Sequence, residues 1–319
     1  MTDTNNATTS GFNEQAKGVY LITVTPFKPD GSLDLDSVDP LIDHYLEAGV
    51  DGLTLLGVLG EAPKLTADEA GAYVKRVLAR VNGAVPVIAG ASAAGFAAMG
   101  ALTKRVMDLG ADGVMVAPAA GLRTDDQIRA YFSMVNETLG PDVPWVLQDH
   151  PNATGVQMSA SVVMQIIDQS ARCVMLKHED CPGLGKLSAI RAAQAQQTLR
   201  HISILSGNGG GLFLPEELVR GADGAMTGFA YPEMMVQVCR AFNAGDLERA
   251  FDLFDAYLPM SRYEQQPGIG LAVRKYILAR RGAIAHDTVR RPGPVLSKAD
   301  IADIERLIER QERRLAQLG

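Results

Sequence analysis

The sequence predicts an α/β fold, a (β/α)8 TIM barrel with a C-terminal helical extension, and three observations support this. Eight short apolar runs alternate with longer amphipathic stretches, as repeated βα units with a buried parallel sheet do. A Gly-x-Asp-Gly type of turn recurs between helical and strand patterns. After Tyr231 only helical patterns follow. Eight strands favour a closed barrel over an open sheet.

Each predicted strand is a short run rich in β-branched and other apolar residues. The eight runs are 19–24, 52–56, 86–89, 113–117, 145–148, 174–177, 203–206 and 225–227. The recurring turns are 48–52, 109–113 and 221–224, where glycine ends a helix and a second glycine opens a strand. Open α/β sheets use such turns too, so these turns are stronger evidence for the α/β class than for a closed barrel.

Amphipathic spacing predicts a helix after each of the first six strands and four more at the end. The barrel helices are 36–48, 67–81, 97–109, 124–139, 159–169 and 185–196, and the extension helices are 233–244, 247–257, 269–281 and 298–318. Thr66 with Glu69 three residues later predicts a capping box for the second of these.

These patterns divide the chain into three segments. Residues 1–17 are polar, without the apolar segment of a signal peptide, and we expect a disordered tail. Residues 18–232 form the catalytic barrel and residues 233–319 the helical extension. No apolar run is long enough to span a membrane, so no membrane partner is expected.

The composition is ordinary for a soluble globular enzyme, and the cysteines favour the cytoplasm. The net charge is -7, with 21% charged residues, which argues against a nucleic-acid partner. Three cysteines without CxxC spacing favour a reducing compartment over a disulfide framework. Five histidines lack the spacing of metal ligands, so no metal site is expected.

Lys177 is the sharpest catalytic candidate. Active sites of barrels lie where the strands end, and Lys177 closes an apolar strand. Desolvation there favours the neutral amine, a nucleophile suited to forming an imine with a carbonyl. The alternative is a lysine that reaches water or pairs with Glu179.

The loop after the second strand is a candidate binding site for a carboxylate. Gly57, Val58 and Leu59 begin a Gly-x-x-Gly-Glu turn whose backbone N–H groups could approach an anion. The alternative is a tight turn without a binding role, which the same residues would form. Other strand ends supply further substrate-binding candidates, namely Thr23, Gly207 and Asn208.

Proton transfer requires acid and base groups at the same end of the barrel. The candidates are Gln148, Asp149, His150 and Glu179, which follow the fifth and sixth strands. His150 and His178 could instead be structural, as single histidines in loops usually are.

Several segments resemble the dihydrodipicolinate synthase/N-acetylneuraminate lyase family of class I, Schiff-base-forming enzymes. They are 21–27 with Asp30-Gly31, Gly57 to Glu61, 86–90, Leu176-Lys177, Ser206 to Asn208, Arg274-Lys275 and Arg291-Pro292, in the family's order from Gly18 onward. The resemblance implies an imine between Lys177 and a 2-oxo acid, no metal or organic cofactor, and a homotetramer built as a dimer of dimers.

Departures from the family pattern favour one branch. Val58 and Leu59 stand where aldol-forming members carry threonines, Gln148 where they carry a tyrosine, and Ala153 where an arginine grips a second carboxylate. Gln-Asp-x-Pro with Lys177-x-Glu179 is similar to the branch of L-2-keto-3-deoxyarabonate dehydratase. We expect a lyase that dehydrates a 2-keto-3-deoxy sugar acid; the alternatives are retro-aldol cleavage to pyruvate and an aldehyde, or a catalytically silent 2-oxo-acid-binding barrel.

Overall fold

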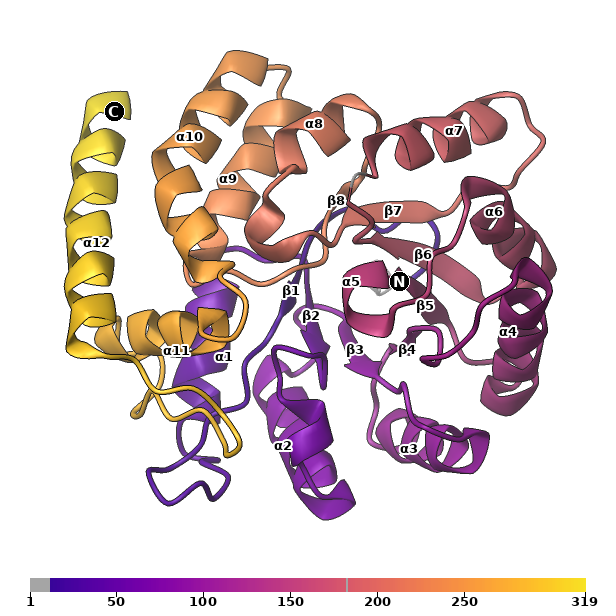
Figure 1. The fold of residues 1–319 in the computed structure, drawn as a ribbon, viewed down its shortest axis with the longest axis horizontal. Coiled ribbons are helices and arrows are strands. Elements are labelled where there is room, and N and C mark those ends of the chain that lie inside the picture. Colours follow the sequence, from indigo (N-terminus) through magenta and orange to yellow (C-terminus); the bar gives the residue numbers. More distant parts are fainter. Residues whose placement is uncertain (1–11, 182) are drawn as a thin grey trace, which may run out of the picture.

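The chain folds into a closed barrel of eight parallel strands surrounded by helices, as Figure 1 shows for the computed structural model. The structure describes residues 12–181 and 183–319. The strands pair in chain order, and β8 closes the barrel on β1 with Gly18 opposite Gly224. The predicted fold class is confirmed.

The strands agree with the predicted apolar runs to within a few residues. They are β1 (Gly18–Ile22), β2 (Gly52–Leu55), β3 (Val87–Gly90), β4 (Gly113–Val116), β5 (Trp145–Asp149), β6 (Cys173–His178), β7 (Ser203–Ser206) and β8 (Gly224–Ala225). The prediction succeeds because both faces of each strand are buried, which requires continuous apolar runs.

Most helices also begin and end near their predicted positions. Those around the barrel are α1 (Val38–Glu47), α2 (Ala67–Val81), α3 (Phe96–Asp108), α4 (Asp125–Leu139), α5 (Pro151–Thr154), α6 (Ala160–Gln169), α7 (Leu184–Ala195) and α8 (Leu214–Val219). Those that follow the last strand are α9 (Pro232–Asn243), α10 (Leu247–Glu264), α11 (Gly270–Arg280) and α12 (Lys298–Leu318), with short 3-10 turns η1 (Ala62–Lys64) and η2 (Gly209–Gly211) elsewhere.

Local signals account for the turns. Gly49, Gly110 and Gly221 have φ of 83°, 102° and 92°, a left-handed conformation that favours glycine after a helix. The capping box of Thr66 and Glu69 is present at the start of α2. The short helices α5 and α8 were not predicted, because four and six residues are too few for a periodic pattern.

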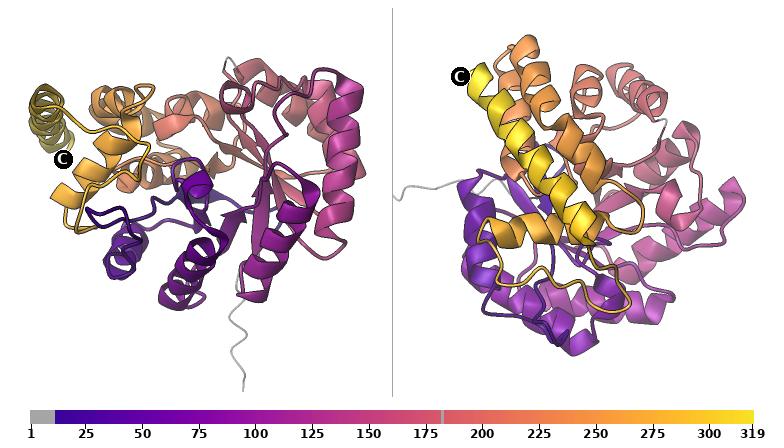
Figure 2. Two further views of the ribbon diagram at one scale, coloured as in Figure 1. Left: turned by 60° about the horizontal axis from the view of Figure 1, so that its bottom comes forward. Right: turned by 60° about the vertical axis from the view of Figure 1, so that its left-hand side comes forward.

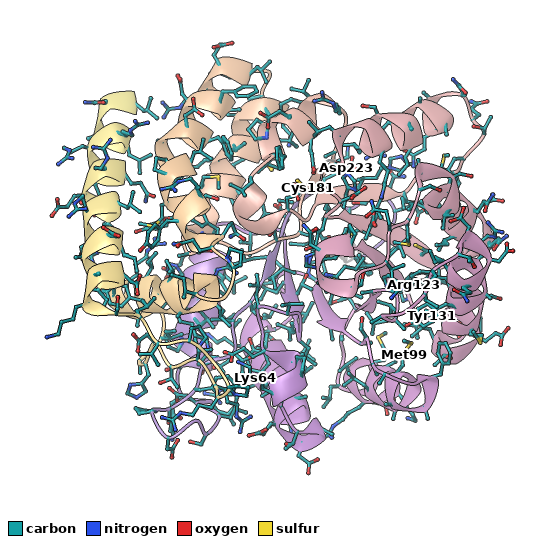
Figure 3. The ribbon with its side chains drawn as sticks, viewed as in Figure 1. Lys64, Met99, Arg123, Tyr131, Cys181 and Asp223 are labelled. Atoms are coloured by element: carbon teal, nitrogen blue, oxygen red, sulfur yellow. The ribbon has the colours of Figure 1, made fainter. Side chains whose placement is uncertain are left out.

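Two apolar cores result. The larger core lies between the strands and the helices; Figure 3 shows Met99 of α3 and Tyr131 of α4 within this layer. The smaller core fills the barrel and includes Tyr20, Ile22, Ile88, Met115, Val146, Met175, Leu205 and Met226. Strand residues therefore alternate between the barrel interior and the helical layer.

The predicted tail is partly corrected by the structure. Residues 1–11 lie outside the described residues. Phe12, by contrast, is buried in the inner core, with its ring centroid 6.3 Å from that of Tyr20. A single large aromatic side chain suffices to fix this short polar segment against the base of the barrel.

The extension lies along one side of the ring. In Figure 2, α12 runs along the outside of the other extension helices, and Arg249 of α10 donates a hydrogen bond to the carbonyl oxygen of Leu318 at 2.7 Å. No helix in the described part of the chain is long and apolar enough to cross a membrane.

Candidate active site

Adjacent ends of β5 and β6 bring the main polar candidates together. Gln148 pairs with Lys177 across the two strands, and Asp149 pairs with His178. Since Val146 and Met175 belong to the inner core, Gln148 and Lys177, two residues further along each strand, also face inward. Asp149 and His178 face the helical layer.

Lys177 and Glu179 form a buried ion pair at the top of the barrel. Lys177 Nζ lies 2.9 Å from Glu179 Oε1, and the two residues are 5% and 7% exposed. Gln148 Nε2 donates to the same carboxylate oxygen at 2.7 Å. The lysine predicted to form an imine is therefore in direct contact with a carboxylate that can accept or deliver a proton.

His150 extends this cluster toward open space. Its Nδ1 lies 3.4 Å from Glu179 Oε2, the second oxygen of the carboxylate. Burial lowers the pKa of His150, against the opposing effect of Glu179, so the imidazole is neutral at pH 7. A neutral imidazole here has one N–H to donate and one nitrogen to accept.

Gly207 is required by the close packing of this cluster. A Cβ at this position would overlap Cγ of Glu179 and lie 2.9 Å from Cγ of Lys177. The backbone N–H of Gly207 donates to His178 O at 2.7 Å, which holds the end of β7 against β6. Gly207, predicted to bind substrate, thus leaves room for the side chains of Lys177 and Glu179.

Asp149 belongs to a different cluster, which corrects its place among the catalytic candidates. Its Oδ2 accepts from Lys186 Nζ at 2.7 Å and lies 3.9 Å from His178 Nδ1. Lys186 also pairs with Asp180 at 2.7 Å. Burial raises the pKa of Asp149 to about 6, with Lys186 opposing the rise. Alternation along β5 directs this side chain away from Lys177.

Thr23 and Asn208 are also directed to partners in the helical layer. Thr23 Oγ1 lies 2.9 Å from the hydroxyl of Tyr73 in α2, and Asn208 Nδ2 donates to Glu217 Oε1 in α8 at 3.0 Å. The Thr23 hydroxyl is buried in this contact, so its assignment to substrate binding is corrected. Asn208 remains at a strand end, with its amide nitrogen already bonded.

The loop after β2 presents free backbone donors. Gly60 N donates to Gly57 O at 3.0 Å and Glu61 N to Val58 O at 3.1 Å, which closes a tight turn. Within the described residues, the N–H groups of Val58 and Leu59 donate no hydrogen bond. Leu56, just before the turn, has φ of 54°, a strained conformation for a residue with a side chain.

A cavity of about 1060 Å³ connects the two groups of candidates. Gly57 and Val58 line one side, and Gln148 and His150 line the other. Glu179 lies behind the latter two, in contact with both. Most of the remaining wall is apolar, including Ala119, Ala120 and Ala153.

Three polar residues near the site were not predicted to have a role there. Lys186 holds Asp149, Glu217 holds Asn208, and Lys275 of α11 holds Glu61 with its Nζ 2.6 Å from Oε1. One signal was available, because Arg274-Lys275 interrupts an otherwise apolar helical stretch. Their partners are 37, 9 and 214 positions away, beyond the reach of local patterns.

Comparison with known proteins decides the family. The sequence model described as the dihydrodipicolinate synthetase family matches residues 15–311. The chain belongs to this family. Members of the family are lyases, and this chain is an enzyme of that class.

Named relatives of the family include two kinds of enzyme. A 4-hydroxy-tetrahydrodipicolinate synthase of Oceanobacillus iheyensis is 34% identical over 76% of this chain and 80% of its own. An L-2-keto-3-deoxyarabonate dehydratase of Azospirillum brasilense is 28% identical over 94% and 97%. A crystal structure of a dihydrodipicolinate synthase from Rhodopseudomonas palustris is 49% identical, covers 94% of this chain and 99% of its own, and has a TM-score of 0.92.

Proposed function

We propose that this enzyme forms a Schiff base between Lys177 and a 2-oxo acid of the 2-keto-3-deoxy sugar acid type, and that it dehydrates the substrate. The observation that carries the proposal is the contact of Glu179 with Lys177 Nζ on one oxygen, at 2.9 Å, and with His150 on the other, at 3.4 Å. This contact supports Glu179 as the base that acts on the carbon next to the imine.

The proposed reaction has three stages. The Lys177 ammonium group gives up one proton and the free amine attacks the C2 carbonyl; the carbonyl oxygen then leaves as water, carrying that proton and one from the nitrogen, and an iminium ion remains. Glu179 removes a proton from C3, and the resulting enamine expels the C4 hydroxyl, which takes that proton from Glu179 and departs as water. Hydrolysis of the imine then frees the lysine, so the net change is the loss of one water molecule.

The other groups orient the substrate. The free N–H groups of Val58 and Leu59 would bind the C1 carboxylate, as backbone donors bind an oxyanion. Neutral His150 would donate a hydrogen bond to the C4 hydroxyl. Gln148 supplies an amide that steers Glu179 without itself exchanging a proton, which suits proton transfer through the carboxylate rather than through a tyrosine.

The first test is chemical trapping of the imine. Incubation with pyruvate and sodium borohydride, followed by mass spectrometry and peptide mapping, should give a pyruvate-sized adduct on Lys177. Lys177→Ala should abolish the adduct. Lys186→Met is the matched control, because it removes another lysine, half-buried at the same end of the barrel, and should leave the adduct intact.

The second test separates dehydration from cleavage. A panel of 2-keto-3-deoxy sugar acids is incubated with untreated enzyme, and the products are identified by mass spectrometry. Loss of 18 mass units, about the mass of one water, supports dehydration by the enamine route. Release of pyruvate and an aldehyde would instead assign retro-aldol cleavage, and imine formation without any product would assign a silent binding protein.

We also propose that the enzyme works in the cytoplasm as a homotetramer, a dimer of dimers. The support for this assembly is the volume of the cavity. At about 1060 Å³, with mainly apolar walls, the cavity is larger than a small 2-oxo acid, and a neighbouring subunit could cover the remaining apolar surface. Sedimentation-velocity measurements at micromolar concentration should give a tetramer. A monomer would contradict this assembly without touching the chemistry.

A further inference from the structure

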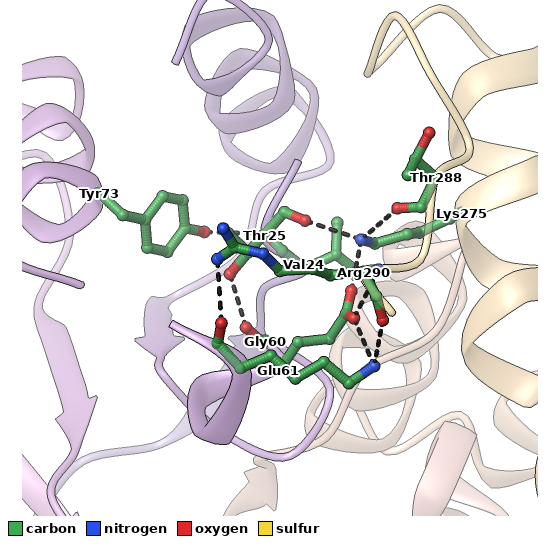
Figure 4. Close-up of polar contacts among 9 residues, drawn as sticks. Val24, Thr25, Gly60, Glu61, Tyr73, Lys275, Thr288 and Arg290 are labelled. Carbon is green, nitrogen blue, oxygen red and sulfur yellow. Dashed lines mark hydrogen bonds and ion pairs between the residues drawn. The ribbon is translucent and has the colours of Figure 1, made fainter. Parts of the chain in front are cut away.

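A buried ion pair connects the loop after β2 to the C-terminal extension. Glu61, the last residue of the Gly-x-x-Gly-Glu turn, is 2% exposed. Its Oε1 accepts from Lys275 Nζ at 2.6 Å, and its Oε2 accepts from Lys64 Nζ at 2.8 Å and from the backbone N–H of Arg290 at 3.0 Å. Figure 4 shows these contacts converging on one carboxylate.

Lys275 uses all three of its N–H donors in this region. Besides Glu61, its Nζ donates to the carbonyl oxygens of Thr25 and Thr288, each at 2.8 Å. The side chain is fully buried, and burial lowers its pKa to about 8, against the opposing effect of Glu61. One ammonium group thus joins the chain after β1, the loop after β2 and the segment after α11 (Figure 4).

The turn that receives this support is conformationally demanding. Glu61 has φ of 54°, a left-handed conformation that is unfavourable for a residue with a side chain. The preceding carbonyl, Gly60 O, accepts from Thr25 Oγ1 at 2.7 Å. Such a backbone persists only where its surroundings fix it, and the fixed turn is what leaves the N–H groups of Val58 and Leu59 without a partner among the described residues.

We propose that Lys275 is a positioning residue for the carboxylate-binding turn, and that the helical extension thereby sets the affinity of the enzyme for the carboxylate of its substrate. Lys275 contacts Glu61, which lies two residues after Leu59, and Thr25, whose hydroxyl is bonded to Gly60 in the same turn. It therefore acts on the N–H groups of Val58 and Leu59 through these two residues. The inference rests on the proposed function, because it takes the free N–H groups of Val58 and Leu59 as the binding site for the substrate carboxylate.

The experiment compares two carbonyl probes that differ in charge. Pyruvate and pyruvamide have nearly the same shape, but pyruvamide carries an uncharged amide in place of the carboxylate. Borohydride trapping on Lys177 of the full-length enzyme is measured as a function of the concentration of each probe. Lys275→Met should raise the half-saturating concentration of pyruvate about tenfold, the loss of roughly one good hydrogen bond, and leave that of pyruvamide unchanged.

Two further variants separate positioning from stability. Thr25→Val removes the hydrogen bond to Gly60 O without removing a charge, and should also raise the half-saturating concentration of pyruvate. This variant carries the test if Lys275→Met does not fold. Arg191→Met breaks an ion pair with Asp223, which precedes β8 at the opposite end of the strands, and should lower stability while leaving the trapping of both probes unchanged.

The possible results distinguish failure of the inference from failure of the proposed function. An unchanged pyruvate concentration dependence in Lys275→Met and Thr25→Val, or an equal shift for both probes, overturns the inference and leaves the proposed function standing. A wild-type enzyme that forms no adduct with pyruvate overturns the proposed function, and the inference with it.

Discussion

At the scale of single residues, Glu179 is the group on which the proposed chemistry depends. It contacts Lys177, Gln148 and His150 within 3.4 Å. Glu179→Gln keeps the shape and removes the base, so kcat should fall about a hundredfold to ten-thousandfold while trapping of pyruvate on Lys177 persists. Steady-state kinetics and adduct mapping test this. The control is Asp149→Asn, which removes a carboxylate from the outer face of β5. This variant should retain most of the wild-type activity.

Gly207 provides a second prediction at this scale. Gly207→Ala would push a methyl group into Glu179 and Lys177, so we expect a fall in kcat of about a hundredfold and a loss of stability. Gly185→Ala in α7 meets no atom within 4 Å, and should be neutral or stabilise by about 0.5–1 kcal/mol. Equal activity of the two variants in the same assay would contradict the packing argument.

At the scale of elements, α8 carries a buried acid that makes its docking depend on pH. Burial raises the pKa of Glu217 to about 7, with the hydrogen bond from Asn208 opposing the rise. Because the pKa of Glu217 in the folded state lies above the ordinary glutamate value of 4.5, the folded state holds the proton more tightly than the unfolded state does. The stability that Glu217 contributes is therefore present below pH 4.5 and is lost as pH rises to about 7.

Glu217→Gln should remove this dependence. Relative to wild type, the variant should gain free energy of unfolding as pH rises from 4.5 to 7, by up to about 3 kcal/mol. Urea denaturation at pH 5 and pH 8 measures the difference, with the neighbouring Glu216→Gln as the control. A difference between wild type and Glu217→Gln that is the same at both pH values would exclude the assigned cause.

At the scale of the whole molecule, the two ends of the barrel have separate tasks. The site lies at the carboxyl ends of the strands, whereas Phe12 closes the inner core beside Tyr20 and Gly113, near the start of β1 and β4. Phe12→Ala should lower the free energy of unfolding by about 3 kcal/mol, and should leave kcat unchanged below the unfolding transition. Val295→Ala, at a side chain that is 91% exposed, should change neither quantity.

The sequence by itself determined the order of the elements, the number of strands, the capping box of α2 and the place of Lys177 next to the end of an apolar strand, which the structure extends by one residue to His178. These features depend on neighbours a few positions away, so a period of two or 3.6 and a glycine at a turn are enough to specify them. The helices that were missed, α5 and α8, are the ones too short to show a period.

Only the tertiary structure decided which strand-end residues meet. The tilt of the strands determines which alternate residues face the barrel interior, so Gln148 joins Lys177 whereas Asp149 and Thr23 turn to the helices. The Glu61 to Lys275 contact joins residues 214 positions apart, and no local pattern encodes such a distance. The chain carries its fold in local patterns, and closure of the barrel assembles the candidate site.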